Sequence, residues 1–210
     1  MRESVFTHHS LLITNHMTNT KNFEPKGLVF DCDGTLADTM PLHWRAWQAI
    51  SLRHDLHFPE DRFYSLGGVP SRDILKMLAQ EQGRPIDHIA VAHEKENAYL
   101  PLMATVEPIH AVVEIAKANF GKIPMAVASG GTQPIIIGVL EHLKIRHLFA
   151  AVVTSEMVVN QKPAPDIFLE AARRIGVDPK FCRGYEDTDL GMQAIRSAGM
   201  DAVDVRQLRG

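Results

Sequence analysis

Acidic, hydroxyl and basic side chains stand at four places along the sequence, each at or shortly after the end of an apolar run. These places are Asp31 with Asp33, Ser129, Lys162, and the acid pair at 186–187. Such a set suits phosphoryl transfer through an aspartyl-phosphate. One carboxylate attacks phosphorus and a second protonates the leaving oxygen, while a divalent metal and a lysine neutralise charge. The residue types therefore indicate phosphoryl-transfer chemistry.

Taken singly, each place has a simpler interpretation. The two aspartates could be solvated loop residues, Ser129 a helix cap, Lys162 a surface charge, and Glu186 with Asp187 an acid pair at a helix N-terminus. Other phosphate and metal motifs do not fit. The sequence holds no GxxxxGK[ST] loop, and an EF-hand needs glycine at its sixth position, whereas Gly34 is fourth. The order of the four places along the chain favours a single site, because each follows a predicted strand and ligands bind at the carboxyl ends of strands in an open α/β sheet.

Short apolar runs and helical periodicity alternate along the chain. In the helical segments apolar residues recur at i, i+3, i+4 and i+7, as at Ile136, Val139, Leu140 and Leu143. This alternation predicts an α/β fold with a Rossmann-like parallel sheet core. The predicted strands are residues 27–30, 124–128, 150–154 and 202–205, with a further segment at 181–185 before the acid pair.

A long stretch after the first strand breaks the alternation. Residues 39–105 carry helical patterns at 43–53, 72–82 and 86–100, separated by loops rich in glycine and proline. We expect this stretch to be an inserted helical cap domain over the carboxyl edge of the sheet. Residues 26–38 and 106–210 would then form the α/β core domain. Residues 1–25 are polar and poorly patterned, so we expect a disordered N-terminal tail.

Composition excludes several functional classes. The 210 residues are 45% hydrophobic and 22% charged, with a net charge of −3, which is ordinary globular composition. There is no block of Lys and Arg to follow a phosphate backbone, so we expect no nucleic-acid partner. Apolar runs stay well under the ~18 residues that span a bilayer, so we expect no membrane association. Two cysteines are too few for a disulfide framework, and a cytoplasmic location is expected.

The four motifs together resemble those of the haloacid dehalogenase superfamily, over residues 26 to about 208. The helical insertion resembles the cap of the β-phosphoglucomutase-like branch of that superfamily. Within the branch, the closest resemblance is to bacterial sugar phosphatases of the fructose-1-phosphatase kind. The segments that carry it are VFDCDGTLADTMPLHWRAW, VEPIHAVVE, NQKPAPDIF and GMDAVDVR.

The resemblance implies a role for each motif residue. Asp31 would be the nucleophile and Asp33 the general acid/base. Ser129 would hydrogen-bond the transferring phosphoryl group, and Lys162 would pair with it. Asp33 also excludes the dehalogenase reaction, because the dehalogenases of this superfamily lack an acid at that position.

The resemblance further implies Mg²⁺ as cofactor and a set of residues around the substrate. Thr39 and His43 match positions near the hinge that hold the acid/base in place. The implied metal ligands are Asp31, the main-chain carbonyl of Asp33, Glu186 and Asp187. The candidate substrate-binding residues are Thr39, His43, Gly68, Arg72 and Gly130.

Hydrolysis and mutase chemistry are the two main alternatives. A mutase, such as one interconverting β-glucose 1-phosphate and glucose 6-phosphate, must hold the far phosphate of a bisphosphate with cationic groups. Mutases of this branch carry a lysine in the cap loop and a Ser-x-x-Lys-Asn run. Here residues 66–72 hold no lysine, and residues 129–133 lack both Lys and Asn. Arg72 could grip a phosphate or be a solvated first-turn residue. We expect hydrolysis of small sugar phosphates by a monomer.

Two features leave questions open. The segment before Glu186 reads Phe-Cys-Arg-Gly-Tyr, and Arg183 with Gly184 would weaken a strand buried on both faces. We therefore expect a shifted acid pair or lower stability there, and a non-catalytic module with the same fold stays a third alternative. Cys32, between the aspartates, is better explained as a small buried filler than as a reactive thiol, because no base partner accompanies it.

Overall fold

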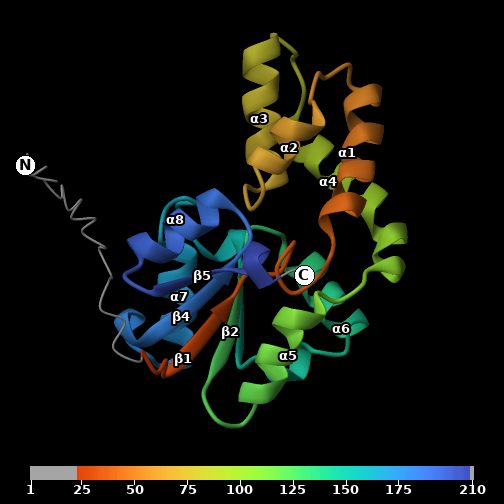
Figure 1. Cartoon of the computed structure of the whole chain (residues 1–210). Helices are drawn as coiled ribbons and strands as arrows, with labels where there is room; N and C mark the ends of the chain where they lie inside the picture. Colours follow the sequence, from red (N-terminus) through yellow and green to blue (C-terminus); the bar gives the residue numbers. More distant parts are fainter. Residues whose placement is uncertain (1–22, 209–210) are drawn as a thin grey trace, which may run out of the picture.

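A parallel five-stranded sheet forms the centre of the molecule, in a computed structural model that describes residues 23–208 (Figure 1). The strand order is β3-β2-β1-β4-β5, with every pair of neighbours parallel. Of the expected tail, residues 1–22 lie outside the described part of the chain. The strands are β1 (Gly27–Phe30), β2 (Met125–Ser129), β3 (Ala151–Thr154), β4 (Cys182–Glu186) and β5 (Asp201–Asp204).

The register of the central strands aligns their carboxyl ends. Phe30, the last residue of β1, pairs with Val127 of β2 and with Tyr185 of β4. The next residue, Asp31, therefore lies beside the ends of both neighbouring strands. The rings of Phe30 and Tyr185 stack with centroids 4.6 Å apart, which packs the sheet just below this edge.

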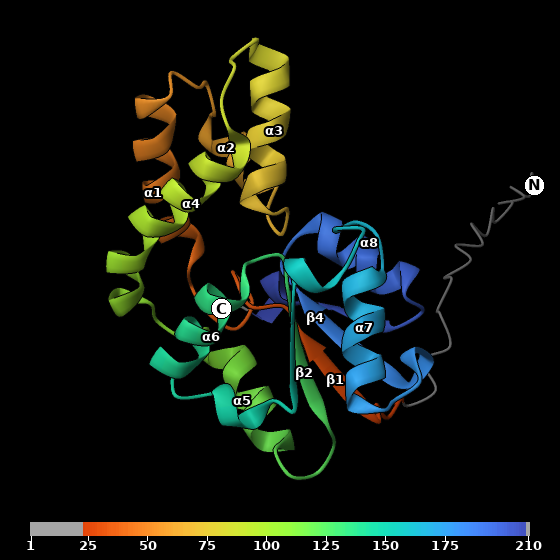
Figure 2. The same cartoon turned by 180° about the vertical axis from the view of Figure 1, so that it is seen from behind.

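Helices cover both faces of the sheet (Figures 1 and 2). One apolar core joins the sheet to α5 (His110–Asn119) and α6 (Gln133–His142), and a second joins it to α7 (Asp166–Ile175) and α8 (Asp189–Ser197). None of the helices in residues 23–208 combines the length and apolar character needed to cross a bilayer. The predicted α/β class with a parallel sheet is confirmed.

Four helices follow β1 and lie above the carboxyl edge of the sheet (Figure 1). They are α1 (Met40–Arg53), α2 (Glu60–Ser65), α3 (Ser71–Gln82) and α4 (His88–Tyr99). Trp47, Ile50, Leu75 and Leu78 belong to an apolar core of their own. A helical insertion is thus present, and the exact boundaries assigned to core and cap stay a prediction.

Several cap elements differ from the expected pattern. Helix α1 begins at Met40, three residues before its expected start, and α3 begins one residue early, at Ser71. Helix α2 was not predicted, because it has only six residues and Phe63 alone among them is buried. Helix α4 begins two residues later than expected. The Asp87 side chain accepts hydrogen bonds from the N–H groups of Ile89 and Ala90, which fixes the first turn at His88.

The strand before the acid pair forms without the expected disturbance. Arg183 lies opposite Asp201 of β5, and its Nε donates a 2.5 Å hydrogen bond to the Asp201 carboxylate. Its guanidinium also lies over the Phe23 ring, and 28% of its side chain stays exposed. A Cβ on Gly184 would come within 2.7 Å of Ile195, so the glycine lets α8 pack closely. The arginine is therefore paired, and the glycine serves packing.

Candidate active site

Asp31 and Lys162 form a buried ion pair at the carboxyl edge of the sheet. Asp31 directly follows β1 and is 3% exposed, and Lys162 precedes α7 and is 4% exposed. Lys162 Nζ donates to Asp31 Oδ1 at 2.6 Å and to Glu186 Oε1 at 2.8 Å. Burial lowers the pKa of Lys162, but the charges of Asp31 and Glu186 outweigh it and raise the pKa above its usual range. The lysine therefore stays charged.

Three carboxylates gather around that lysine. Oxygen atoms of Asp31, Glu186 and Asp187 all lie within 4.8 Å of one another. Asp187 is fixed by a 2.8 Å hydrogen bond from Thr35, and a Cβ on Gly34, whose φ is +82°, would collide with it. Burial, with the charges of Glu186 and Asp187, raises the pKa of Asp31 well above its usual range. One lysine does not balance three acids, and hard divalent cations prefer such oxygens, so the cluster can hold a cation.

Asp33 is held by hydrogen bonds from three sides. Thr39 Oγ1 donates to its Oδ1 at 2.6 Å, and His43 Nε2 lies 3.2 Å from the same oxygen. Ser129 Oγ donates to Oδ2 at 3.3 Å. Burial alone would raise the pKa of Asp33, but the His43 and Thr39 hydrogen bonds and the charge of Lys95 lower it to about 2. The carboxylate is therefore ionised and fixed in direction.

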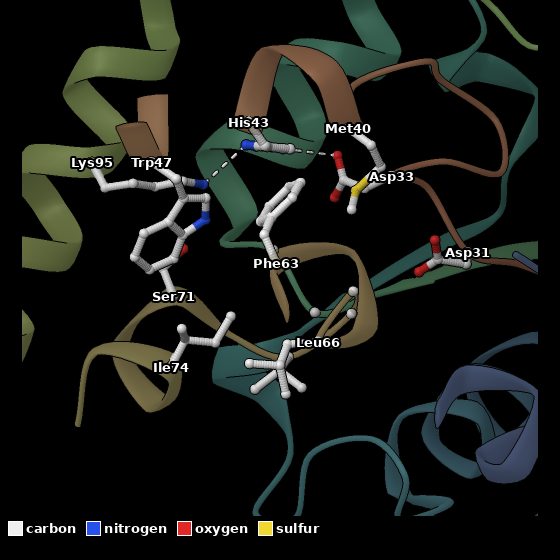
Figure 3. Close-up of a pocket in the computed structure, with 15 residues that line it drawn as sticks. Asp31, Asp33, Met40, His43, Trp47, Phe63, Leu66, Ser71, Ile74 and Lys95 are labelled. Carbon is white, nitrogen blue, oxygen red and sulfur yellow. Dashed lines mark hydrogen bonds and ion pairs between the residues drawn. The ribbon is translucent and has the colours of Figure 1, made fainter. Parts of the chain in front are cut away.

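A buried lysine, Lys95, contacts His43 on the side of the ring away from Asp33 (Figure 3). Lys95 Nζ, on α4, donates to His43 Nδ1 at 2.9 Å, so the ring proton belongs on Nε2, which faces Asp33. The His43 ring also stacks on Tyr99, with centroids 4.0 Å apart. Burial lowers the pKa of His43, and it lowers the pKa of Lys95 to about 8. A neutral histidine thus links a cap lysine to the core carboxylate.

The cap loop at residues 66–69 lines the same pocket as both aspartates (Figure 3). Asp31 and Asp33 line a cavity of about 70 Å³ together with cap residues such as Trp47. Gly68, with φ +83°, places its carbonyl against Gly130 of the loop after β2, where a Cβ would overlap it. Close contact between these two loops thus requires glycine on both sides.

The sequence matches the haloacid dehalogenase-like hydrolase family over residues 28–205. The chain belongs to this family.

The relatives of this chain include both phosphatases and mutases. The chain is 42% identical to fructose-1-phosphate phosphatase YqaB of Escherichia coli, over 87% of this chain and 97% of that protein. It is 32% identical to a β-phosphoglucomutase of Bacillus subtilis, over 87% and 84% of the two chains. The crystal structure of β-phosphoglucomutase from Clostridium difficile superposes with a TM-score of 0.76 at 27% identity, covering 88% and 87%. The resemblance to this family is confirmed.

Most of the residues singled out in this hydrolase lie around the two aspartates, and Arg72 lies beside a second cavity. Thr39 is fully buried, and its hydroxyl is bonded to Asp33 instead of capping α1. Arg72 lines the second cavity instead of the one that holds the aspartates. Its guanidinium donates to Ser155, at 3.4 Å to the hydroxyl and 3.5 Å to the carbonyl, beside a second cavity.

Lys95 and Tyr99 are functional candidates that the motifs did not reveal. Both lie on the buried face of α4 with Val91 and Ala92. This spacing of i, i+1, i+4 and i+8 places a lysine on an apolar helical face, which is a visible signal in the sequence. Lysine is almost never fully buried unless it is paired, so a lysine at such a position indicates a buried partner.

Proposed function

We propose that this hydrolase is a Mg²⁺-dependent phosphatase of small sugar phosphates that forms an aspartyl-phosphate on Asp31. The observation that carries the proposal is the pairing of Asp31 and Asp33 in one cavity, with the Lys162 ion pair beside them. The 42% identity to a fructose-1-phosphate phosphatase supports hydrolysis of a sugar phosphate.

The two carboxylates act in two successive displacements, Asp31 as nucleophile and Asp33 first as acid and then as base. Asp31 attacks phosphorus, and the bond from phosphorus to the sugar oxygen breaks as Asp33 gives that oxygen a proton. Asp33 then takes a proton from water, which attacks the aspartyl-phosphate and releases inorganic phosphate. Lys162 balances negative charge beside Asp31, and the Ser129 hydroxyl can donate a hydrogen bond to the phosphoryl oxygens.

The surroundings of Asp33 suit both directions of proton transfer. With its pKa at about 2 before substrate binds, the group is a carboxylate held toward the cavity by Thr39 and His43. A phosphate group bound nearby brings negative charge, which raises the pKa of Asp33 and favours the protonated acid. Transfer of phosphate to Asp31 then returns Asp33 to its role as base.

The acidic cluster fits a magnesium ion. Asp31, Glu186 and Asp187 supply carboxylate oxygens, and the main-chain carbonyl of Asp33 is the remaining proposed ligand. When bound, Mg²⁺ neutralises charge on the attacking carboxylate and on the phosphoryl oxygens. Burial and the neighbouring acids raise the pKa of Asp31, and a cation held by this cluster would favour its ionised form.

Cap movement is part of the proposed cycle. A cavity of about 70 Å³ is small beside typical ligand pockets of about 300 Å³ or more. The loop holding Gly68 must therefore lift from Gly130 to admit a sugar phosphate. Closure afterwards excludes bulk water while phosphate moves to Asp31.

Mutase activity is the second candidate, favoured by the similarity to β-phosphoglucomutases. Such an enzyme must hold a second phosphate while its bisphosphate intermediate turns round. The loop after β2 supplies no lysine for that purpose, so hydrolysis is the better supported function.

Asp31→Asn tests the nucleophile directly. The variant should release no phosphate, and mass spectrometry should detect a phosphoryl adduct only on the wild type. Asp178→Asn is the matched control, because Asp178 is exposed at the opposite end of β4 and should leave turnover unchanged. Hydrolysis by Asp31→Asn at a rate near that of the wild type would rule out the aspartyl-phosphate.

A further inference from the structure

A second cavity of about 260 Å³ adjoins the one that holds the aspartates. The two cavities share four lining residues, so they are direct neighbours. A substrate whose phosphate lies at Asp31 can extend past this shared border. The shared residues are Ser71, Lys95, Gly130 and Gly131.

The carboxylate of Glu156 lies at the N-terminus of α6, beside this cavity. Glu156 Oε2 accepts hydrogen bonds from the Gln133 N–H at 3.0 Å and from Thr154 Oγ1 at 2.8 Å. Gln133 is the first residue of α6, a ten-residue helix. Free N–H groups at a helix N-terminus attract phosphate, and here Glu156 takes that place.

A second carboxylate faces the same cavity from the cap. Glu96 of α4 lines the cavity together with Glu156. Burial raises the pKa of Glu96, and the charge of Glu156 adds to this, against the lowering effect of Lys95 and His93. The two long cationic side chains on this lining are already engaged. Lys95 is bonded to His43, and Arg72 to Ser155. His93 is the third basic residue of the lining, and its Nδ1 lies 3.8 Å from Glu96 Oε2. A second phosphate would have to draw one of these side chains away from its present partner.

We propose that the second cavity binds the uncharged, hydroxyl-bearing end of the substrate, and that Glu156 with Glu96 excludes sugar bisphosphates. Sugar hydroxyls can donate to these two carboxylates, whereas a second phosphate would meet like charge at the N-terminus of α6. This inference rests on the proposed phosphatase function and gives its substrate class as monophosphates. Exclusion of bisphosphates by Glu156 and Glu96 would also favour hydrolysis over mutase activity, because a mutase must retain a bisphosphate.

Glu156→Gln tests this selection with fructose 1-phosphate and fructose 1,6-bisphosphate. Cleavage at C1 is followed by enzyme-coupled detection of fructose and of fructose 6-phosphate, respectively. The wild type should favour the monophosphate at least 10-fold in kcat/KM. Glu156→Gln should raise kcat/KM for the bisphosphate by about 3- to 10-fold relative to the monophosphate, and adding Glu96→Gln should raise it further.

The control keeps the same helix and the same charge change. Glu141 is exposed near the other end of α6, so Glu141→Gln should leave the preference unchanged. Glutamine retains an oxygen that can accept the Gln133 hydrogen bond, so Glu156→Gln keeps the helix cap. The proposal is overturned if the preference of Glu156→Gln stays within twofold of the wild-type value, or if the wild type has no preference.

Failure of the phosphatase function gives a different result. Then neither ester is hydrolysed at C1, and calorimetric binding of both compounds to Asp31→Asn decides the present inference. Tighter binding of the monophosphate, with the difference reduced by Glu156→Gln, supports the selection. Equal binding, or a difference that Glu156→Gln does not change, rejects it.

Discussion

Lys95→Met removes a buried charge while keeping a long side chain. Lys95 is 5% exposed, and its Nζ lies 5.7 Å from the ring centroids of both Trp47 and Tyr99. A methionine thioether can pack against these rings. The loss is the hydrogen bond to His43 Nδ1. The substitution therefore separates the stability of the cap from the support that His43 gives to Asp33.

The change in stability follows from the pKa of Lys95. Burial lowers this pKa from 10.5 to about 8, and each pKa unit corresponds to about 1.4 kcal/mol. The buried ammonium therefore destabilises the fold by on the order of 3 kcal/mol at pH 7. Leaving His43 Nδ1 without its donor costs about 1–3 kcal/mol. At pH 7, Lys95→Met should be between equally stable and about 2 kcal/mol more stable than the wild type.

The pH dependence of stability gives the sign unambiguously. In the unfolded chain Lys95 keeps its proton up to about pH 10.5, whereas the folded protein releases it near pH 8. Between these values the unfolded chain binds more protons, so the wild-type free energy of unfolding rises with pH. The contribution from Lys95 should grow by about 2–3 kcal/mol from pH 7 to pH 10, and the variant should lack it.

The activity of Lys95→Met should fall, although its stability at pH 7 should equal or exceed that of the wild type. Without Lys95, His43 loses the donor that fixes its tautomer, and Asp33 is less well held. We expect kcat/KM to fall by about 10- to 100-fold, within the usual range for general acid–base groups. The wild type should lose activity as pH rises through about 8, when Lys95 gives up its proton, and this alkaline limb should be absent in the variant.

Urea unfolding at pH 7 and pH 10, with pH–rate profiles, measures both effects. Lys76→Met is the control, because Lys76 is exposed on the neighbouring helix α3. The control should differ from wild type by the same amount at both pH values. The same constant difference for Lys95→Met, or a kcat/KM equal to that of the wild type, would contradict this role of Lys95.

Three further predictions concern the chemistry and the packing. Asp33→Asn should slow esters with poor leaving groups more than p-nitrophenyl phosphate, since only the former need a proton; equal losses in a leaving-group series would count against the acid role. Gly184→Ala should lower the free energy of unfolding by about 1–3 kcal/mol, because the added Cβ would collide with Ile195. In the control Gly138→Ala the added Cβ meets only the flexible end of Met103, so this variant should be as stable as the wild type or more stable in denaturant melts. A chelator should abolish phosphate release, and added Mg²⁺ should restore it; activity that persists after exhaustive chelation would argue against the cation.

The convergence of the motifs was predictable because it follows from the alternation of strands and helices. Asp31, Ser129 and Glu186 each lie at or just past the end of an apolar run, and carboxyl ends of parallel strands share one edge. Lys162 follows the same logic through the loop before α7. The structure places these four around one edge of the sheet.

The remaining contacts depend on packing between distant segments. Lys95 meets His43 only because α4 packs against α1, and no local pattern specifies that pairing. Arg183 looked costly because its partner, Asp201, is found only once β5 is known to flank β4. Glu156 likewise meets the start of α6 through the fold of β3 beside β2. Sequence periodicity predicts the buried faces of helices and the ends of strands, whereas these residue pairs depend on how distant elements pack in the folded structure.

Phosphate release with and without Mg²⁺ is the most direct test of the proposed phosphatase function. The substrates are fructose 1-phosphate, glucose 6-phosphate, 6-phosphogluconate and β-glucose 1-phosphate, with isomerisation of the last followed in parallel after priming by a bisphosphate. We expect steady Mg²⁺-dependent phosphate release from one or a few of these sugars, and no isomerisation. Conversion of β-glucose 1-phosphate to glucose 6-phosphate without net phosphate release would contradict the proposed function and establish a mutase.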